Sequence, residues 1–257
     1  MDLKITGRRA LVTGASTGIG HATALALAAE GVRLAVSARN EAALAALRDE
    51  IAATGAAAPE IVVADITTAA GCAQVVAETQ ARLGGVDILV NTAGGSRPRD
   101  AGNADQTEDD WWEEAFALNF TAARRITGGL VPGMTAAGWG RIVTLTGAMT
   151  QPGVNAAGPA KAALWSWSRS LSAQLAPHGI TVNCIAPGRI STPQIVGRLF
   201  PTEEARRTEI AQRIPMGRFG EPAELAALVA FLASDIAGYI TGTQIPVDGG
   251  MFRMALP

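Results

Sequence analysis

The residues from Thr13 to Gly20 have the composition of a loop that binds phosphate. Glycines let the backbone turn tightly and approach a pyrophosphate, and free N–H groups at a helix start attract an anion. The run follows a short aliphatic segment and precedes a helical pattern, which is where dinucleotide-binding folds place their phosphates. We therefore expect this loop to bind the pyrophosphate of a dinucleotide.

A second position bears on which dinucleotide binds. The second aliphatic run ends at Ser37-Ala38-Arg39-Asn40, where a site for NAD(H) presents a carboxylate to the ribose 2′-hydroxyl. No acidic residue stands there, and Arg39 has the charge and geometry to meet a 2′-phosphate. We predict NADP(H) as the cofactor, with NAD(H) less favoured. The competing interpretation is that Arg39 is a solvated residue at a helix start.

The elements that position these residues follow from the hydrophobic pattern. Short aliphatic runs alternate with longer amphipathic stretches, which is typical of βαβ units and a parallel sheet. The predicted strands are 10–13, 33–37, 61–64, 86–90, 141–146, 181–185 and 244–247. The predicted helices are 18–30, 41–54, 68–83, 107–136, 156–176 and 221–233. This pattern predicts an α/β fold, a doubly wound parallel sheet of about seven strands with helices on both faces.

The alternation continues along the chain without a linker or a low-complexity segment, so we expect a single domain over residues 1–257. Residues 191–220 alone break the rhythm, being rich in Arg, Pro and Gly with a short helical pattern over 202–213. A segment of this length after a strand's carboxyl end is a candidate lid over a site. An ordinary surface excursion is the alternative.

Composition excludes several function classes. The 257 residues carry 21 basic and 23 acidic side chains, a net charge of −2, without basic blocks that would attract nucleic acid or an anionic membrane. Two cysteines, Cys72 and Cys184, make no disulfide framework and no zinc motif. No apolar stretch is long enough to span a bilayer. We expect a cytoplasmic protein with no metal and no nucleic-acid or membrane partner.

Further motifs follow in a fixed order along the chain. They are Asp65-Ile66, Asn91-Thr92-Ala93-Gly94, Leu118-Asn119, Lys161, Asn183 to Gly188, Pro215-Met216-Gly217-Arg218 and Asp248-Gly249-Gly250. Together with the glycine-rich run, they resemble the short-chain dehydrogenase/reductases, in the branch of the 3-oxoacyl-carrier-protein reductases. The resemblance extends from about Gly7 to Gly250 and implies a Rossmann-type fold, a small-molecule substrate and a homo-oligomer, either a tetramer or a dimer.

The resemblance also implies the cofactor contacts. The residues that it assigns to the pyrophosphate side are Gly14, Ser16, Thr17, Gly18 and Ile19. Those assigned to the adenine are Asp65 and Ile66, and those along the middle of the cofactor are Asn91, Ala93, Gly94 and Lys161. Those expected against the nicotinamide and its carboxamide are Pro187, Gly188, Ile190 and Thr192.

The catalytic set is incomplete by comparison with the family. In the family, a tyrosine delivers the proton, a serine binds the developing oxyanion, a lysine four residues after the tyrosine lowers its pKa, and an asparagine holds a water relay. Lys161 and Asn119 are present. Ala157 stands at the tyrosine position and Gly147 at the serine position.

The hydroxyl groups nearby offer limited replacements. Thr146 and Thr150 are the candidates for the missing serine hydroxyl, and we name Lys161, Asn119 and Thr146 as the candidate catalytic residues. The single tyrosine of the chain, Tyr239, precedes the last strand, where we expect it to pack and to do no chemistry.

Three hypotheses on function remain open. The first is an NADP(H)-dependent oxidoreductase for a small carbonyl or alcohol, with a substitute proton donor in Lys161, a water near Asn119 or the substrate. The second is a dehydration, isomerisation or decarboxylation on the same scaffold, and the third is a cofactor-binding protein without turnover. An alteration of the chain by design at Ala157 or Gly147 is a further alternative. The lid and the loop 95–105, with Arg97 and Arg99, should shape the substrate pocket.

Overall fold

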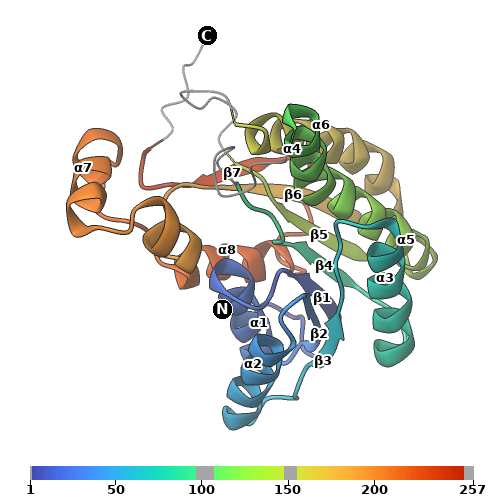
Figure 1. The fold of residues 1–257 in the computed structure, drawn as a ribbon. Coiled ribbons are helices and arrows are strands. Elements are labelled where there is room, and N and C mark those ends of the chain that lie inside the picture. The colour runs from blue at the N-terminus through green and yellow to red at the C-terminus, as the bar shows by residue number, and fades with distance from the viewer. Residues whose placement is uncertain (1, 97–106, 148–154, 252–257) are drawn as a thin grey trace.

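Seven short aliphatic segments of the chain form one parallel sheet. The computed structural model describes residues 2–96, 107–147 and 155–251, and Figure 1 shows the sheet between two layers of helices. The strands are β1 (Arg9–Thr13), β2 (Arg33–Ala38), β3 (Glu60–Val63), β4 (Ile88–Asn91), β5 (Gly140–Leu145), β6 (Ile180–Pro187) and β7 (Gln244–Val247). Their order is β3-β2-β1-β4-β5-β6-β7, which confirms the predicted doubly wound α/β fold.

Residues of the central strand β1 alternate between the two faces of the sheet. Ala10 and Val12 belong to one hydrophobic core, and Leu11 belongs to the other. Because both faces are covered, the strands are continuous aliphatic runs and not alternating ones. This is why short apolar runs, and not a two-residue period, predicted the strands.

Helices cover the two faces in separate groups. One group is α1 (Gly18–Ala29), α2 (Glu41–Ala53) and α8 (Pro222–Leu232), which share a core with β1 and β2. The other is α3 (Ala69–Leu83), α4 (Glu108–Phe116), α5 (Ala122–Ala137) and α6 (Ala157–Leu175), followed by the short η2 (Ala176–His178). None of the helices within the described ranges is long and apolar enough to cross a membrane.

The helix predicted over 107–136 contains a wider turn that the sequence did not indicate. Between α4 and α5, the π-helical turn η1 (Ala117–Thr121) continues the helix with one extra residue per turn. Such turns are frequent at functional sites, and this one carries Asn119. The change in period over one turn is too small to disturb the apolar pattern.

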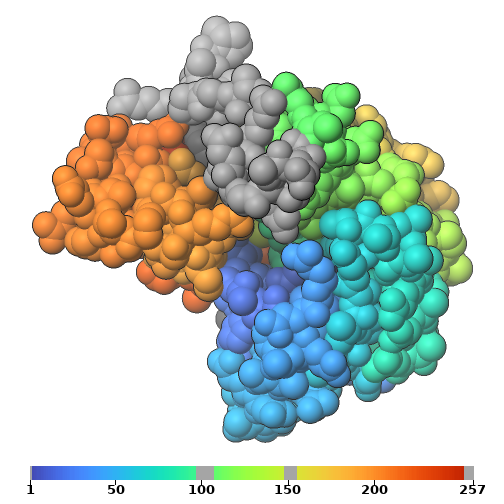
Figure 2. Space-filling view, viewed as in Figure 1, coloured from blue at the N-terminus to red at the C-terminus, as the bar shows by residue number. Residues whose placement is uncertain are grey.

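Residues 191–220, which follow β6, leave the sheet and return to the place where they left it; we call this segment the excursion. Ser191 N donates to Gly220 O, and Gly220 N donates to Arg189 O, so the two ends of the excursion pair with each other. Between them lie a second π-helical turn, η3 (Ile195–Leu199), and α7 (Glu203–Arg213). In Figure 2 this segment, in orange, projects from one side of the molecule.

Candidate functional site

A cavity of about 810 Å³ lies at the carboxyl ends of the strands. Between β1 and β4 the order of the strands reverses, and ligands of open α/β sheets bind at this reversal. Most of the residues predicted for the site line the cavity: Gly14, Ser16, Thr17, Gly18, Ile19, Arg39, Asp65, Ile66, Ala93, Gly94, Thr146, Lys161, Pro187, Gly188, Ile190 and Thr192. Asn91 and Asn119 do not line it.

The glycine-rich loop approaches its neighbours too closely to carry side chains. Gly14 and Gly18 have φ angles of 69° and 58°. A β-carbon on Gly14 would lie 2.7 Å from Cα of Ala93, and one on Gly18 would lie 2.9 Å from Cγ2 of Thr192. The loop therefore packs directly against the end of β4 and the start of the excursion, and it leaves main-chain groups facing the cavity.

The first helix begins without a side-chain cap, unlike its neighbours. Asn40 caps α2 and Thr68 caps α3, whereas Thr17 at the start of α1 makes no capping hydrogen bond. The main-chain N–H groups of Gly18 and Ile19 bond to no acceptor in the described part of the chain. Free N–H groups and the positive end of the helix dipole suit a phosphate.

Arg39 and Asp65 form the charged end of the cavity. Arg39 is exposed and follows β2 directly. Hydrogen bonds from the main chain and the hydroxyl of Thr67, with a smaller contribution from the charge of Arg39, hold the pKa of Asp65 below its usual value. The carboxylate is therefore ionised at neutral pH and accepts from Thr67, and the Arg39 guanidinium is the cation at this end.

Lys161 reaches the middle of the cavity from α6. Its Nζ donates to the carbonyl oxygen of Thr146 at 3.0 Å. Burial of the ammonium lowers the pKa of Lys161 to about 8. Gly147 lies against the stem of this lysine, since a β-carbon there would be 3.3 Å from Cδ of Lys161.

Asn119 is a buried connector at the edge of the cavity. Its Oδ1 accepts from Gly95 N at 3.0 Å, and its Nδ2 donates to the carbonyls of Gly95 and Ala115 at 3.0 and 2.9 Å. The amide thus joins η1 to the segment after β4. Both of its donor hydrogens are used, while Oδ1 keeps a second lone pair.

The hydroxyl of Thr146 is turned away from the cavity. It donates to the carbonyl of Ile185 at 3.2 Å and accepts from Nε2 of Gln244 at 2.7 Å. The side chain is buried, and its single proton is engaged in the sheet. This geometry counts against Thr146 as the donor to an oxyanion, and the main-chain carbonyl of Thr146 contacts Lys161 instead. Thr150 lies outside the described residues, as do Arg97 and Arg99.

Asn91 also differs from its expected place. Its Nδ2 lies 3.3 Å from the hydroxyls of Thr127 and Thr144, so the side chain points to the helix layer behind the sheet. The residue shapes the end of β4 and leaves Ala93 and Gly94 to line the cavity. Its role in the structure is therefore to hold the strand end.

Ala157 separates the main cavity from a smaller one. It is buried, stands four residues before Lys161 at the start of α6, and lines both cavities. The smaller cavity, about 190 Å³, also contacts Trp111, Leu118 and Asn119. Space for a larger side chain or for substrate thus adjoins Ala157.

Among the polar residues that line the main cavity and that sequence reasoning missed are Asn155 and Gln194. Asn155 also accepts from Gly158 N at 2.9 Å at the start of α6. Neither residue belongs to a recognisable motif. The one available signal was their position, Asn155 just before a helix and Gln194 within the excursion after β6.

The expectation that Tyr239 packs is wrong for the single chain. Its side chain is fully exposed and does not line the cavity. Among the described residues, no group of three or more His, Cys, Asp or Glu side chains is arranged to hold a metal ion.

Known proteins are similar to this chain in sequence and in fold. The family model described as enoyl-(acyl carrier protein) reductase matches residues 14–252. The chain is 36% identical over 253 residues to the 3-oxoacyl-(acyl-carrier-protein) reductase FabG of Pseudomonas aeruginosa, with 97% of this chain and 99% of that protein covered.

Two solved structures have the same fold with different ligands. One is L-sorbose reductase from Gluconobacter frateurii, complexed with NADPH and L-sorbose, with a TM-score of 0.89, 32% identity, and 99% and 100% of the two chains covered. The other is 7α-hydroxysteroid dehydrogenase, complexed with NADH and 7-oxo glycochenodeoxycholic acid, with a TM-score of 0.88, 31% identity, and 97% and 96% covered. By sequence and by fold, this chain belongs to the short-chain dehydrogenase/reductase family of oxidoreductases.

Proposed function

We propose that the chain is an NADP(H)-dependent oxidoreductase of small carbonyl compounds or alcohols whose proton donor is not a tyrosine. The observation that carries the proposal is the environment of Lys161. Its ammonium faces a large cavity, with Ala157 and Gly147 where relatives would place a tyrosine and a serine. The cofactor elements are retained, and the usual proton donor is not.

The residues around the cavity fit a dinucleotide. Gly14 and Gly18 pack so closely against Ala93 and Thr192 that β-carbons would clash there, and the loop with the free N–H groups of α1 forms a cradle for phosphate at the cavity. We assign the pyrophosphate to this cradle, the adenine to Asp65 and Ile66, and the nicotinamide to the segment from Pro187 to Thr192.

The choice of NADP(H) rests on the end of β2. Arg39 is exposed beside the cavity, and no carboxylate is available between Ser37 and Asn40 to bind two ribose hydroxyls. Relatives of this fold bind NADPH in one structure and NADH in another, so the fold does not decide the matter. The guanidinium of Arg39 favours the phosphorylated form.

The lysine has the properties of a general acid. A bound nicotinamide supplies or accepts the hydride. The ammonium of Lys161 uses one of its three N–H groups on Thr146 and has two left for a substrate oxygen or a water. A pKa of about 8 is near the operating pH, which suits proton transfer. The remaining lone pair on Oδ1 of Asn119 is available to hold such a water.

We expect weak stabilisation of an oxyanion in this site. Gly147 has no hydroxyl, and that of Thr146 is engaged with Ile185. Loss of a positioned acid alone costs a factor of about 10² to 10⁴. We therefore expect slow turnover of ordinary ketones. The lid assignment for residues 191–220 belongs to the same proposal, because Ile195, Leu199 and Phe200 line the cavity from that segment.

The proposed function also includes a homo-oligomer, either a tetramer or a dimer. Trp165 and Trp167 of α6 are both half-buried in the single chain, and the ring of Trp167 packs edge-on against Phe120 of η1. The indole N–H of Trp165 is buried with no acceptor in the described part of the chain. Paired copies of this helix would cover these rings. Sedimentation analysis measures the state directly.

Restoring the tyrosine tests the function. NADPH consumption is followed against a panel of ketones for the wild type, Ala157→Tyr and the control Ala157→Phe, which adds the ring without the hydroxyl. We expect Ala157→Tyr to raise kcat/KM about 100-fold, with a further gain from Gly147→Ser, and Ala157→Phe to give no gain. The proposal is rejected if Ala157→Tyr binds NADPH tightly and reduces no ketone.

Two other outcomes separate the alternatives. A product formed without net consumption of NADPH by the wild type would favour a dehydration, isomerisation or decarboxylation. Tight NADPH binding without a product from any variant would favour a protein that binds the cofactor and does not turn over.

A further inference from the structure

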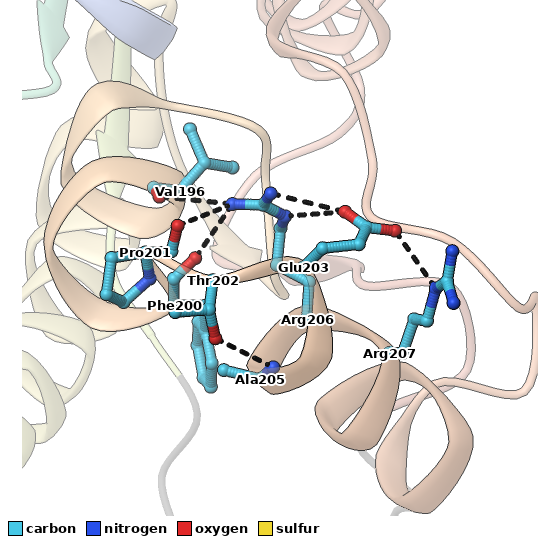
Figure 3. A network of polar contacts seen from close by, with 8 residues as sticks. All are labelled: Val196, Phe200, Pro201, Thr202, Glu203, Ala205, Arg206 and Arg207. Carbon is cyan, nitrogen blue, oxygen red and sulfur yellow. Dashed lines mark hydrogen bonds and ion pairs between the residues drawn. The ribbon is translucent and has the colours of Figure 1, made fainter.

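Arg206 joins α7 to the end of η3 through main-chain carbonyls. Its Nη1 atom lies 3.4, 3.0 and 3.3 Å from the carbonyl oxygens of Val196, Phe200 and Pro201 (Figure 3). The last carbonyls of a helical turn have no partner within the turn, and a cation near them is favourable. The side chain of Arg206, which belongs to α7, thus donates hydrogen bonds to carbonyl groups at the end of η3.

A carboxylate orients this arginine. Oε2 of Glu203 lies 3.2 Å from both Nε and Nη2 of Arg206, and Oε1 accepts from Nε of Arg207 at 3.1 Å. Glu203 and Arg207 are mostly exposed, whereas Arg206 is not. Exposed ion pairs contribute little energy, so the role of Glu203 is to aim the guanidinium.

The residue at the junction, Phe200, is held on its other sides as well. The guanidinium of Arg189 lies 5.1 Å from the centre of its ring, and the ring of Phe219 packs against it edge-on at 5.9 Å. Arg189 also forms an ion pair at 2.8 Å with Glu209 of α7. The carbonyl bound by Arg206 and the ring held by Arg189 therefore belong to the same residue.

This junction forms part of the cavity. Ile195, Leu199 and Phe200 are apolar residues of the excursion that line it. From the same turn, Arg198 donates to the carbonyl of Ser96 at 2.8 Å. Two arginines thus hold the turn, and the residues that it places at the cavity are apolar.

We propose that Arg206 is a positioning residue that keeps Leu199 and Phe200 as an apolar wall of the cavity, against which the substrate places an apolar group. The inference rests on the proposed function, since it concerns the substrate of that site. It names a carbonyl or alcohol with an alkyl or aryl group next to the reacting carbon.

The test compares Arg206→Ala and Arg206→Lys with the control Arg207→Ala. Arg207 contacts the same carboxylate but none of the carbonyls of η3, so its loss removes the ion pair and leaves the junction. A lysine at position 206 keeps the charge and cannot reach three carbonyls and Glu203 together. Three quantities are measured for each variant: hydrogen exchange of residues 195–201, the Kd of NADPH, and the binding of butan-2-ol and octan-2-ol to the complex with NADP⁺ by calorimetry.

We expect the wild type to bind octan-2-ol at least about tenfold more tightly than butan-2-ol, because each buried methylene adds affinity. In Arg206→Ala this preference should fall to about threefold or less, and exchange over 195–201 should rise at least about tenfold, since the amide of Phe200 loses its fixed turn. Arg206→Lys should be intermediate. Arg207→Ala should match the wild type, and the Kd of NADPH should stay within about twofold throughout.

Several results would overturn the inference. If the wild type binds butan-2-ol and octan-2-ol with equal affinity, the substrate does not place an apolar group against Leu199 and Phe200. If hydrogen exchange over 195–201 and the preference for octan-2-ol are unchanged in Arg206→Ala, Arg206 does not position the turn. If Arg206→Ala weakens the binding of NADPH as much as that of octan-2-ol, Arg206 supports the whole cavity and not the apolar wall alone. If the wild type does not bind NADPH, the proposed function fails, while the exchange measurement still decides whether Arg206 fixes the turn.

Discussion

The side chains of Lys161 and Asn119 both reach the space next to the α-carbon of Gly94. A β-carbon built on Gly94 would lie 3.0 Å from Oδ1 of Asn119 and 3.3 Å from Nζ of Lys161. The two residues come from different helical elements, η1 and α6, and the end of β4 brings them together. Gly94 therefore sets the spacing between the lysine and the water-holding amide of the proposed mechanism.

Adding a methyl group at this position should separate the pair. We predict that Gly94→Ala raises the Kd of NADPH about tenfold, because the overpacking costs about 1 to 3 kcal/mol and displaces the ammonium. Gly95→Ala is the control, since its β-carbon would meet only the amide of Gln194 at 3.7 Å. Fluorescence titration measures both constants. Equal effects of the two substitutions would contradict the assigned role of Gly94.

Removal of the cation at the end of β2 should change the cofactor preference. Arg39→Ala should weaken NADPH binding about 10- to 100-fold, as expected for a lost charged hydrogen bond of about 1.5 to 3 kcal/mol, and leave NADH binding unchanged. Arg48→Ala, on the exposed side of α2, is the matched control. The prediction fails if Arg39→Ala weakens both cofactors equally.

The buried ammonium should make stability depend on pH above neutrality. The pKa of Lys161 is lowered to about 8 from an ordinary value of 10.5, so between these two values the unfolded chain holds a proton that the folded chain has lost. The free energy of unfolding should therefore rise with pH in this window, by about 2 kcal/mol relative to Lys161→Met.

Urea titrations of the two proteins from pH 7 to pH 10 measure this difference and cancel the titration of other groups. A constant difference would show that the lysine keeps its ordinary pKa. If Lys161 is the proton donor, kcat should also fall as the pH rises through about 8, because the donor loses its proton.

The ion pair of Arg9 and Asp87 should stabilise the fold away from the site. Burial alone would raise the pKa of Asp87, but hydrogen bonds from the side chain and main chain of Arg9 outweigh it and hold the pKa below its usual value. Asp87→Asn should lower the free energy of unfolding by about 2 kcal/mol. The midpoint of thermal unfolding should fall by roughly 4 to 8 °C.

The sign of its pH dependence is opposite to that of the lysine. The ionised carboxylate of Asp87 stabilises the fold at pH values above the pKa of the unfolded chain, which is near 4. This stabilisation is lost as the pH falls through the pKa of the folded chain, so the free energies of unfolding of the wild type and Asp87→Asn should converge in acid. Glu78→Gln, in an exposed pair with Arg82, should change the midpoint little. Equal free energies of unfolding for the wild type and Asp87→Asn at neutral pH would contradict a stabilising ion pair between Arg9 and Asp87.

Most of the fold was predictable because it follows from periodicity. Aliphatic runs buried on both faces predicted the seven strands, and the amphipathic stretches between them predicted the helices that cover the sheet. The π-helical turn at Asn119 was not predictable, because one extra residue hardly alters the apolar pattern. The exposed Tyr239 shows the limit of the same argument, since hydrophobic character does not say what covers a side chain.

The site was predictable where its chemistry is local. The glycine loop and Arg39 lie beside the strands that end at the cavity, so their positions follow from sequence order. The role predicted for Thr146 was not supported, because its hydroxyl accepts a hydrogen bond from Gln244, which is 98 residues away in the chain. The contacts of Arg206 likewise depend on the path of the segment from Ser191 to Gly220: the helical pattern over 202–213 predicts the helix that carries Arg206, but not the carbonyl groups that its side chain reaches.

The uncapped start of α1 has a consequence for the lifetime of the protein. A side-chain cap contributes about 1 kcal/mol to a helix, and this helix lacks one where α2 and α3 have one. A phosphate that accepts hydrogen bonds from the free N–H groups would stabilise the start of the helix in the same way, so the ligand would act as its N-terminal cap. The fraction of folded chain in a cell would then follow the supply of dinucleotide, and starvation for the cofactor would expose the protein to proteolysis.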